Sequence, residues 1–197
     1  MAAVGQQFYS RNWVLGTSGN FSAVVSRRPL RLAITASAAH KGRLTPRNFL
    51  EIDERGAVVG KRVGKPSAET RLHLEIVKAR GAAAVLHTHS VWGTILSDLH
   101  ADEHGLAIQG YEMLKGLDGV TTHERREWIP IVANDQDMVR LSGVVQTLLA
   151  RDPEVRAFLI RGHGLYTWGA SVDEAARHVE ILEFLLETVG RRSQSWP

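Results

Sequence analysis

The sequence contains no cysteine among its 197 residues. It therefore forms no disulfide bond and offers no thiolate to a metal, so a zinc ion here has only nitrogen and oxygen ligands available. No stretch approaches the roughly 18 consecutive apolar residues of a membrane span. Residues 1–7 also lack the basic and apolar regions of a signal peptide. We expect a cytoplasmic protein with no membrane partner.

The sequence also has no large excess of charge of one sign. The chain has 24 Lys and Arg against 21 Asp and Glu, a formal net charge of +3. Its basic pairs, such as Arg27-Arg28 and Arg125-Arg126, are scattered and are not interleaved with aromatic residues. A nucleic-acid surface needs such clustering, so we expect no nucleic-acid partner. A mild positive charge suits a small phosphorylated metabolite instead.

Hydrophobic residues make up 44% of the chain and charged residues 23%, the composition of an ordinary globular protein. Internal repeats, low-complexity segments and linkers are absent from the sequence, so we expect one domain over residues 1–197. Strand and helix patterns alternate, and tight turns at 54–56 and 162–164 favour antiparallel neighbours. These patterns predict an α/β fold of three layers, with helices on both faces of a central, largely antiparallel mixed sheet.

Hydrophobic periodicity and turn residues give the expected elements. We predict helices at 2–15, from 67 to 80, at 90–99, 110–116, from 135 or 136 to 151, and 173–189. We predict strands at 21–25, 31–35, 49–53, 57–60, 83–90, 106–109, 128–132, 156–160 and 165–168.

Two histidines, with one residue between them, lie near the end of the apolar strand at 83–90. On a strand His87 and His89 leave the same face while Thr88 points the other way. His163, between two glycines that allow a tight turn, is the best candidate for a third ligand. Three histidines leave a fourth position open, which is the catalytic arrangement. The alternative is that these histidines only form hydrogen bonds at a strand end.

The remaining histidines do not show such spacing. His100 and His104 lie in a predicted loop, and a flexible loop does not preorganise a site. We interpret these two as solvated. We interpret the others as structural residues: His40, His73, His123 and His178.

Two short motifs suit an anion. Gly-Thr-Ser-Gly-Asn at 16–20 can expose several backbone N–H groups, although a plain helix-to-strand turn explains it equally. Lys-Pro-Ser-Ala-Glu-Thr at 65–70 predicts a helix start with Ser67 as N-cap, and a helix N-terminus also favours phosphate. Capping alone explains Ser67, and the helix dipole alone explains Glu69.

Taken in order, residues 16–20, 65–70, 87–90 and 161–169 resemble the class II aldolase and adducin superfamily, and the resemblance covers nearly the whole chain. Gln-Gly-Tyr-Glu-Met-Leu-Lys-Gly at 109–116 is most similar to a zinc-dependent branch that removes water from a ketose phosphate.

The resemblance implies a sugar-phosphate substrate and a homotetramer with active sites close to subunit boundaries. It also implies one Zn²⁺ per subunit on three histidines, and phosphate binding at two loops and a helix start. The metal ligands are His87, His89 and His163, and the phosphate residues are Gly19, Asn20, Ser37 and Ser67. Imidazole ligands alone do not separate zinc from Fe²⁺, Co²⁺ or Mn²⁺.

Two carboxylates are candidates for the acid/base. The resemblance implies Glu112 as the acid/base of the dehydratase, although by residue type alone it reads as a surface carboxylate. Glu69 holds the place of the carboxylate that transfers the proton in related aldolases. Both are present, so their presence does not decide the reaction.

Two departures from the family pattern bear on the reaction. Ala68 replaces a second serine of the aldolase pattern, which counts against an aldolase, and Ala38 stands where many relatives have glycine. The alternatives are a sugar-phosphate aldolase or epimerase on the same scaffold, and a metal-free binding module like the adducin head domain. The intact set of three histidines argues against the binding module.

Overall fold

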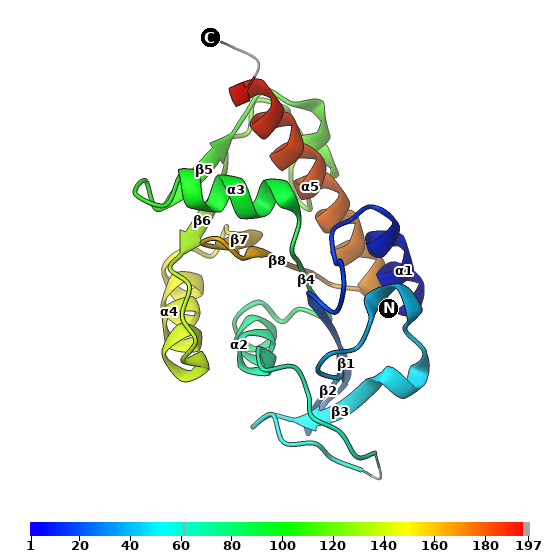
Figure 1. Cartoon of the computed structure of the whole chain (residues 1–197). Coiled ribbons are helices and arrows are strands. Elements are labelled where there is room, and N and C mark those ends of the chain that lie inside the picture. The colour runs from blue at the N-terminus through cyan, green and yellow to red at the C-terminus, as the bar shows by residue number, and fades with distance from the viewer. Residues whose placement is uncertain (61, 195–197) are drawn as a thin grey trace.

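The computed structural model describes residues 1–60 and 62–194, which form an eight-stranded sheet with helices on both faces (Figure 1). The strand order is β3-β2-β1-β4-β8-β7-β6-β5, and only β6 and β7 pair in parallel. The predicted α/β class with a largely antiparallel mixed sheet is therefore confirmed. The strands are β1 (Asn20–Arg27), β2 (Leu30–Thr35), β3 (Phe49–Asp53), β4 (Ala84–Thr88), β5 (Gly105–Ile108), β6 (Glu127–Val132), β7 (Ala157–Ile160) and β8 (Gly164–Gly169).

The helices divide between the two faces of the sheet. The helix bounds are α1 (Ala2–Ser10), α2 (Thr70–Arg80), α3 (Val91–Leu99), α4 (Met138–Arg151) and α5 (Val172–Gln194), with 3₁₀ turns η1 (Lys41–Arg43), η2 (Pro46–Asn48) and η3 (Glu112–Gly116). One face is covered by α2 and α4 and the other by α3 and α5, as Figure 1 shows. No helix of the described residues is long and apolar enough to cross a membrane.

Strand β7 shows why the central strands read as unbroken apolar runs. Phe158 and Ile160 belong to the core cluster under α2 and α4, whereas Ala157 and Leu159 belong to the cluster under α3 and α5. All four side chains are buried. A strand covered on both faces has no solvent side, so its sequence lacks alternating polar residues.

The predicted first helix is too long, because α1 ends at Ser10 and not at residue 15. Asn12 adopts a left-handed conformation with φ 62°. Its N–H donates to the Tyr9 carbonyl, and the Trp13 N–H donates to the Phe8 carbonyl, each over 3.0 Å. This is a Schellman motif, which ends a helix, built here on asparagine where glycine is usual.

Ser67 is not the N-cap of α2, which begins at Thr70 with Glu69 in the cap position. The Ser67 carbonyl accepts the Thr70 N–H over 3.2 Å, and its hydroxyl accepts the Glu69 N–H over 3.3 Å. These bonds form a separate turn ahead of the helix, so Glu69 lies at the junction of loop and helix.

Three other predicted elements also differ, the first being the helix at 110–116, which is the shorter 3₁₀ turn η3. Within the described residues the stretch from 57 to 60 is not a strand, since only Val58 forms an isolated bridge with Ile52. The last helix, α5, runs to residue 194 and not to 189.

Candidate functional site

Three imidazole nitrogens converge at the end of β4. The Nε2 atoms lie 2.8 Å apart for His87 and His89, 3.0 Å for His89 and His163, and 3.3 Å for His87 and His163. His87 is the next-to-last residue of β4, which is buried throughout, His89 follows the strand directly, and His163 comes from the turn between β7 and β8. Three nitrogens this close form one group that could hold a metal ion, because their lone pairs point to a common centre.

The surroundings of His87 fix which nitrogen is available. Its Nδ1 lies 2.9 Å from the Leu165 carbonyl oxygen, which only accepts, so Nδ1 carries the proton and donates. Its ring stacks on Tyr166 with centroids 4.0 Å apart. The Nε2 lone pair is thereby left for the common centre. A metal-bound histidine usually donates its other ring N–H to a carbonyl or carboxylate in this way.

His87 and His89 are neutral at ordinary pH. Burial, followed by the neighbouring His163, holds the pKa of His87 well below its usual range. Burial, and then His87 and His163, lowers the pKa of His89 to about 3. Metals bind the neutral imidazole, so both side chains are in the form that a metal requires.

The turn that carries His163 is held by one side of α3. Three successive residues of the turn are each bonded to α3: the first by an ion pair, the second through its backbone N–H and the third through its backbone carbonyl. They are Arg161 Nε to Asp98 Oδ1 at 2.8 Å, Gly162 N to Ser97 Oγ at 3.0 Å, and Thr94 Oγ1 to the His163 carbonyl at 3.2 Å. The next residue, Gly164, approaches β4 so closely that a Cβ there would lie 2.0 Å from the Thr88 carbonyl oxygen.

Glu69 lies beside the three histidines. Its Oε2 is 3.5 Å from His87 Nε2, and its Oε1 is 3.4 Å from His163 Nε2. The Oε1 atom is buried and accepts no hydrogen bond within the part of the chain that the structure describes. An acceptor without a donor at this position, together with three imidazole lone pairs, fits a divalent cation.

A short chain of hydrogen bonds holds Glu69 from behind. The Asn20 amide donates to Glu69 Oε2, and the His73 Nε2–H donates to the Asn20 carbonyl oxygen. The Ser22 hydroxyl donates to His73 Nδ1 over 2.7 Å. Burial lowers the pKa of His73 to about 4, so the ring is neutral and this set of donors is consistent. Sequence reasoning missed this contact, since His73 reads as an isolated histidine on a helix.

A polar cavity of about 490 Å³ opens in front of Glu69, His89 and His163. Its walls come from two glycine- and serine-containing loops, the start of α2 and the segment before α4. The other lining residues are Thr17, Ser18, Gly19, Asn20, Ala36, Ser37, Ala38, Lys41, Ser67, Ala68, Asn134, Gln136, Met138 and Gly162. All four residues expected to bind phosphate thus face the same cavity as the histidines.

Two backbone donors in these loops are free. Gly19 and Ala38 have left-handed φ values of 69° and 59°. In the described residues neither backbone N–H reaches a protein acceptor. Such exposed N–H groups suit an anion. The Asn20 amide differs, because one of its N–H groups donates to Glu69 and its carbonyl oxygen accepts from His73.

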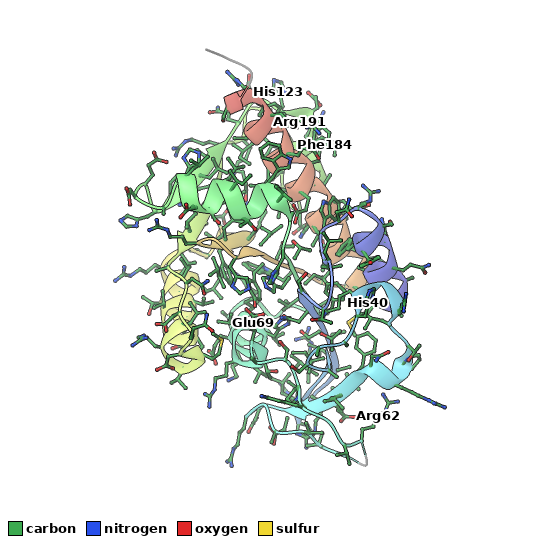
Figure 2. The ribbon with its side chains drawn as sticks, in the orientation of Figure 1. His40, Arg62, Glu69, His123, Phe184 and Arg191 are labelled. Atoms are coloured by element: carbon green, nitrogen blue, oxygen red, sulfur yellow. The ribbon has the colours of Figure 1, made fainter. Side chains whose placement is uncertain are left out.

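The structure does not bring Glu112 to this cavity. It opens η3, its side chain is 68% exposed, and it pairs with Lys115 and with His123 Nδ1 at 3.2 Å. Figure 2 shows His123 at one end of the molecule, well away from Glu69. Within a single chain the two candidate carboxylates therefore lie at different places.

Lys41, Asn134, Gln136 and Met138 line the cavity but were not singled out from the sequence. All four lie in or beside loops, where hydrophobic periodicity carries no information. The only available signal was the polar character of residues 36–43 and 133–137.

Another carboxylate lies buried on the far side of β4. Glu183 of α5 is 2% exposed and accepts the Thr88 hydroxyl, which points away from the neighbouring histidines. Burial raises the pKa of Glu183 to about 7, although bonds from Ser90 and Thr88 oppose the shift. This carboxyl group lies under β4 and is partly ionised at neutral pH.

Glu183→Gln is expected to stabilise the protein at pH 8 but not at pH 4.5. The folded-state pKa of Glu183 is raised from 4.5 to about 7. Its contribution to stability is therefore fully present below pH 4.5 and is lost as the pH rises through about 7, where the buried carboxyl group must ionise. The amide avoids the loss, which amounts to roughly 1–3 kcal/mol. Urea unfolding at both pH values checks this, with the exposed Glu54→Gln as control. An equal effect at both pH values would contradict it.

The family model described as Class II Aldolase and Adducin N-terminal domain matches residues 1–189. The chain is 46% identical over 186 residues to the methylthioribulose-1-phosphate dehydratase of Pseudomonas savastanoi pv. phaseolicola, covering 93% of this chain and 88% of that protein. It is 45% identical over 184 residues to the dehydratase of the same name from Methylococcus capsulatus, covering 93% and 87%.

Solved structures share the fold. A putative aldolase/epimerase/decarboxylase, YgbL from Escherichia coli, matches with a TM-score of 0.79 at 25% identity, covering 96% of this chain and 86% of that one. The l-fuculose-1-phosphate aldolase of Thermus thermophilus matches with a TM-score of 0.75 at 24% identity, covering 100% and 95%. At these identities the aldolase likeness speaks for the fold alone.

Proposed function

The chain belongs to the class II aldolase and adducin family, and from that premise we propose that it is a methylthioribulose-1-phosphate dehydratase. The enzyme is a lyase that removes water from 5-methylthioribulose 1-phosphate and yields 2,3-diketo-5-methylthiopentyl 1-phosphate, a step of methionine salvage. Two relatives of that name, each about 45% identical over 93% of the chain, support this reaction.

The observation that carries the proposal is the convergence of three imidazoles beside a buried carboxylate, at the edge of a cavity with free backbone donors. Neutral imidazoles suit a divalent cation, and free N–H groups suit a phosphate. A ketose phosphate offers both a carbonyl and a phosphate. The site thus combines the two kinds of group that this substrate requires.

We assign the cation as one Zn²⁺ per subunit, held by His87, His89 and His163. When bound, it supplies a Lewis acid for the C2 carbonyl of the substrate, which makes the C3 proton more acidic. The histidines themselves move no proton, because their lone pairs are committed to the cation. Proton transfer therefore falls to a carboxylate.

The reaction needs a base at C3 and an acid at the C4 hydroxyl. We assign both roles to Glu112, which takes the C3 proton and returns a proton to the departing hydroxyl as water is lost. The resulting enol then becomes the 2,3-diketone. Glu69 is fixed by Asn20 beside the histidines, which favours a role in holding the cation and the substrate oxygens.

Because Glu112 lies outside the cavity of its own chain, we propose that it enters the site of a neighbouring subunit in a homotetramer. Its exposed position on η3 leaves it accessible to a second copy. The outer face of α3 carries an exposed apolar stripe of Val91, Ile95 and Leu99, which subunit contact would cover. A site shared between subunits would explain how Glu112 can act as the acid/base although it does not line the cavity of its own chain.

The phosphate end of the substrate is assigned to the loops at Gly19 and Ser37 and to Ser67. Gly19 contributes a backbone donor, and the serines contribute hydroxyl groups. Asn20 donates one amide N–H to Glu69 and keeps its second for the phosphate. We also propose that residues 1–197 form one domain and that the enzyme is cytoplasmic, which a phosphorylated metabolite as substrate supports.

Phosphorus and carbon NMR of 5-methylthioribulose 1-phosphate with the zinc-loaded protein tests the function. We expect the signals of the diketone phosphate, with all carbons retained in one product. The metal-stripped protein is the control and should leave the substrate unchanged. A three-carbon phosphate would indicate the aldolase alternative, and an unchanged substrate with the zinc-loaded protein would overturn the dehydratase reaction.

A further inference from the structure

We propose that Lys41 supplies the positive charge of the phosphate subsite, and that its ammonium group ties the two loops of that subsite together. This inference rests on the proposed function for the identity of the substrate. Its physical basis is the position of one buried cation in the cavity wall.

Lys41 opens η1 at the floor of the cavity, and only 2% of the residue is exposed. Its Nζ donates to the Thr17 carbonyl over 2.6 Å and to the Ala39 carbonyl over 2.8 Å. Thr17 belongs to the loop before β1, and Ala39 belongs to the loop after β2. One side chain therefore joins the two loops that hold the free backbone donors of Gly19 and Ala38.

The charge of Lys41 has no carboxylate partner within ion-pair distance in the described residues. Burial lowers its pKa to about 8, and Glu69 opposes this only from a distance. Keeping an ammonium buried without an anion is unfavourable. A bound phosphate dianion would provide the missing counter-charge, so the apparent defect is relieved when substrate binds.

The cavity wall offers a phosphate little other charge. Among the described lining residues, Lys41 is the one lysine or arginine, and the remainder are neutral apart from Glu69 and the histidines. A phosphate group carries about 1.5 to 2 negative charges at neutral pH. An ammonium has three N–H donors, of which two are used, so a third is left for an anion or for a water beside it.

A purely structural role is the competing explanation, since the two carbonyl bonds alone could justify the residue. Lys41→Gln separates the two roles. The amide keeps two N–H donors, in a side chain one bond shorter, but it carries no charge. A structural role predicts near-normal anion binding in this variant, whereas a charge role predicts a loss.

Binding of inorganic phosphate to the zinc-loaded full-length protein, measured by calorimetry, is the first test. We expect Lys41→Gln to weaken phosphate binding by about 10- to 100-fold, the usual effect of losing a charged hydrogen-bond partner. Lys78→Gln, which removes the same charge from the exposed side of α2, should bind phosphate as the wild type does. Zinc content and circular dichroism should be unchanged in both.

Turnover gives a second readout that a structural role would not move. Lys41→Gln should raise KM by about 10- to 100-fold with kcat within a few-fold, because the charge acts equally on bound substrate and transition state. Discrimination between methylthioribulose 1-phosphate and its unphosphorylated form should fall by the same factor. Equal loss for both substrates would overturn the proposal, as would wild-type phosphate affinity in the variant.

If Lys41→Gln fails to fold, the wild-type protein decides by carbon NMR of its lysine Cε atoms. Phosphate is expected to raise the pKa of the lysine that titrates near 8 by about one unit or more, and an unchanged pKa overturns the proposal. Phosphate binding is measured without turnover, so it tests the role of Lys41 independently of the dehydratase reaction. A Lys41-dependent phosphate site without dehydratase activity would refute the reaction but keep this inference.

Discussion

Glu112→Gln is expected to lower turnover by about two to four orders of magnitude, the usual contribution of a general acid/base. The zinc content should stay at one ion per subunit, because Glu112 lies apart from the three histidines. Steady-state kinetics with metal analysis of the same sample measures both quantities. The amide keeps the size of the side chain and removes only its ability to take and return a proton.

Glu103→Gln is the matched control. Glu103 is 64% exposed and pairs with His100, much as Glu112 is 68% exposed and pairs with His123. It lies in a turn after α3, outside the cavity, so its replacement should leave kcat and KM unchanged. Full turnover in zinc-loaded Glu112→Gln would refute the assigned role, and Glu69→Gln would then be the next variant.

Mixed oligomers test whether Glu112 acts across a subunit boundary. Subunits with Glu112→Gln are inactive in this scheme, and so are subunits with His163→Ala. A tetramer containing both can still form a site that takes its histidines from one subunit and its glutamate from the other. Random mixing should restore up to about a quarter of the wild-type activity. No recovery in a verified mixed tetramer would place all catalytic groups in one chain.

The metal-binding half of the site could be predicted because it rests on local geometry. The spacing of His87 and His89 alone puts both imidazoles on one face of a strand. That His163 meets them depends on β4 pairing with β8, where His87 is opposite Tyr166. Strand pairing between segments so far apart in the chain leaves no trace in spacing, so the glycine-flanked turn makes His163 only a candidate, which the family resemblance then supports.

Contacts between distant polar residues could not be predicted. His73 and Asn20 are 53 residues apart, and the bond between them depends on how α2 lies over β1. Lys41 looks like an ordinary loop lysine, because the sequence does not show that its ammonium is enclosed by two loops. The early end of α1 was missed for a local reason, since asparagine takes the left-handed position where glycine is the usual signal.

His163→Ala is expected to abolish activity and to lower zinc occupancy from one per subunit to roughly a tenth or less, because it removes one of three protein ligands. His163 is the best of the three for this test. Its side chain is 20% exposed, and its Nδ1 forms no hydrogen bond within the described residues. Its loss should therefore disturb the fold less than the loss of fully buried His87.

Metal analysis after dialysis against a weak chelator measures the occupancy, and urea unfolding of the metal-free proteins checks the fold. His100→Ala removes a histidine that pairs with Glu103 and does not belong to the group of three; it is the control and should retain both zinc and activity. Cobalt substitution adds geometry, because visible absorption typical of tetrahedral Co²⁺ should appear in the wild type and be lost in His163→Ala. Stoichiometric zinc in the variant would mean that His87, His89 and Glu69 suffice, which would make Glu69 a ligand and His163 a neighbour.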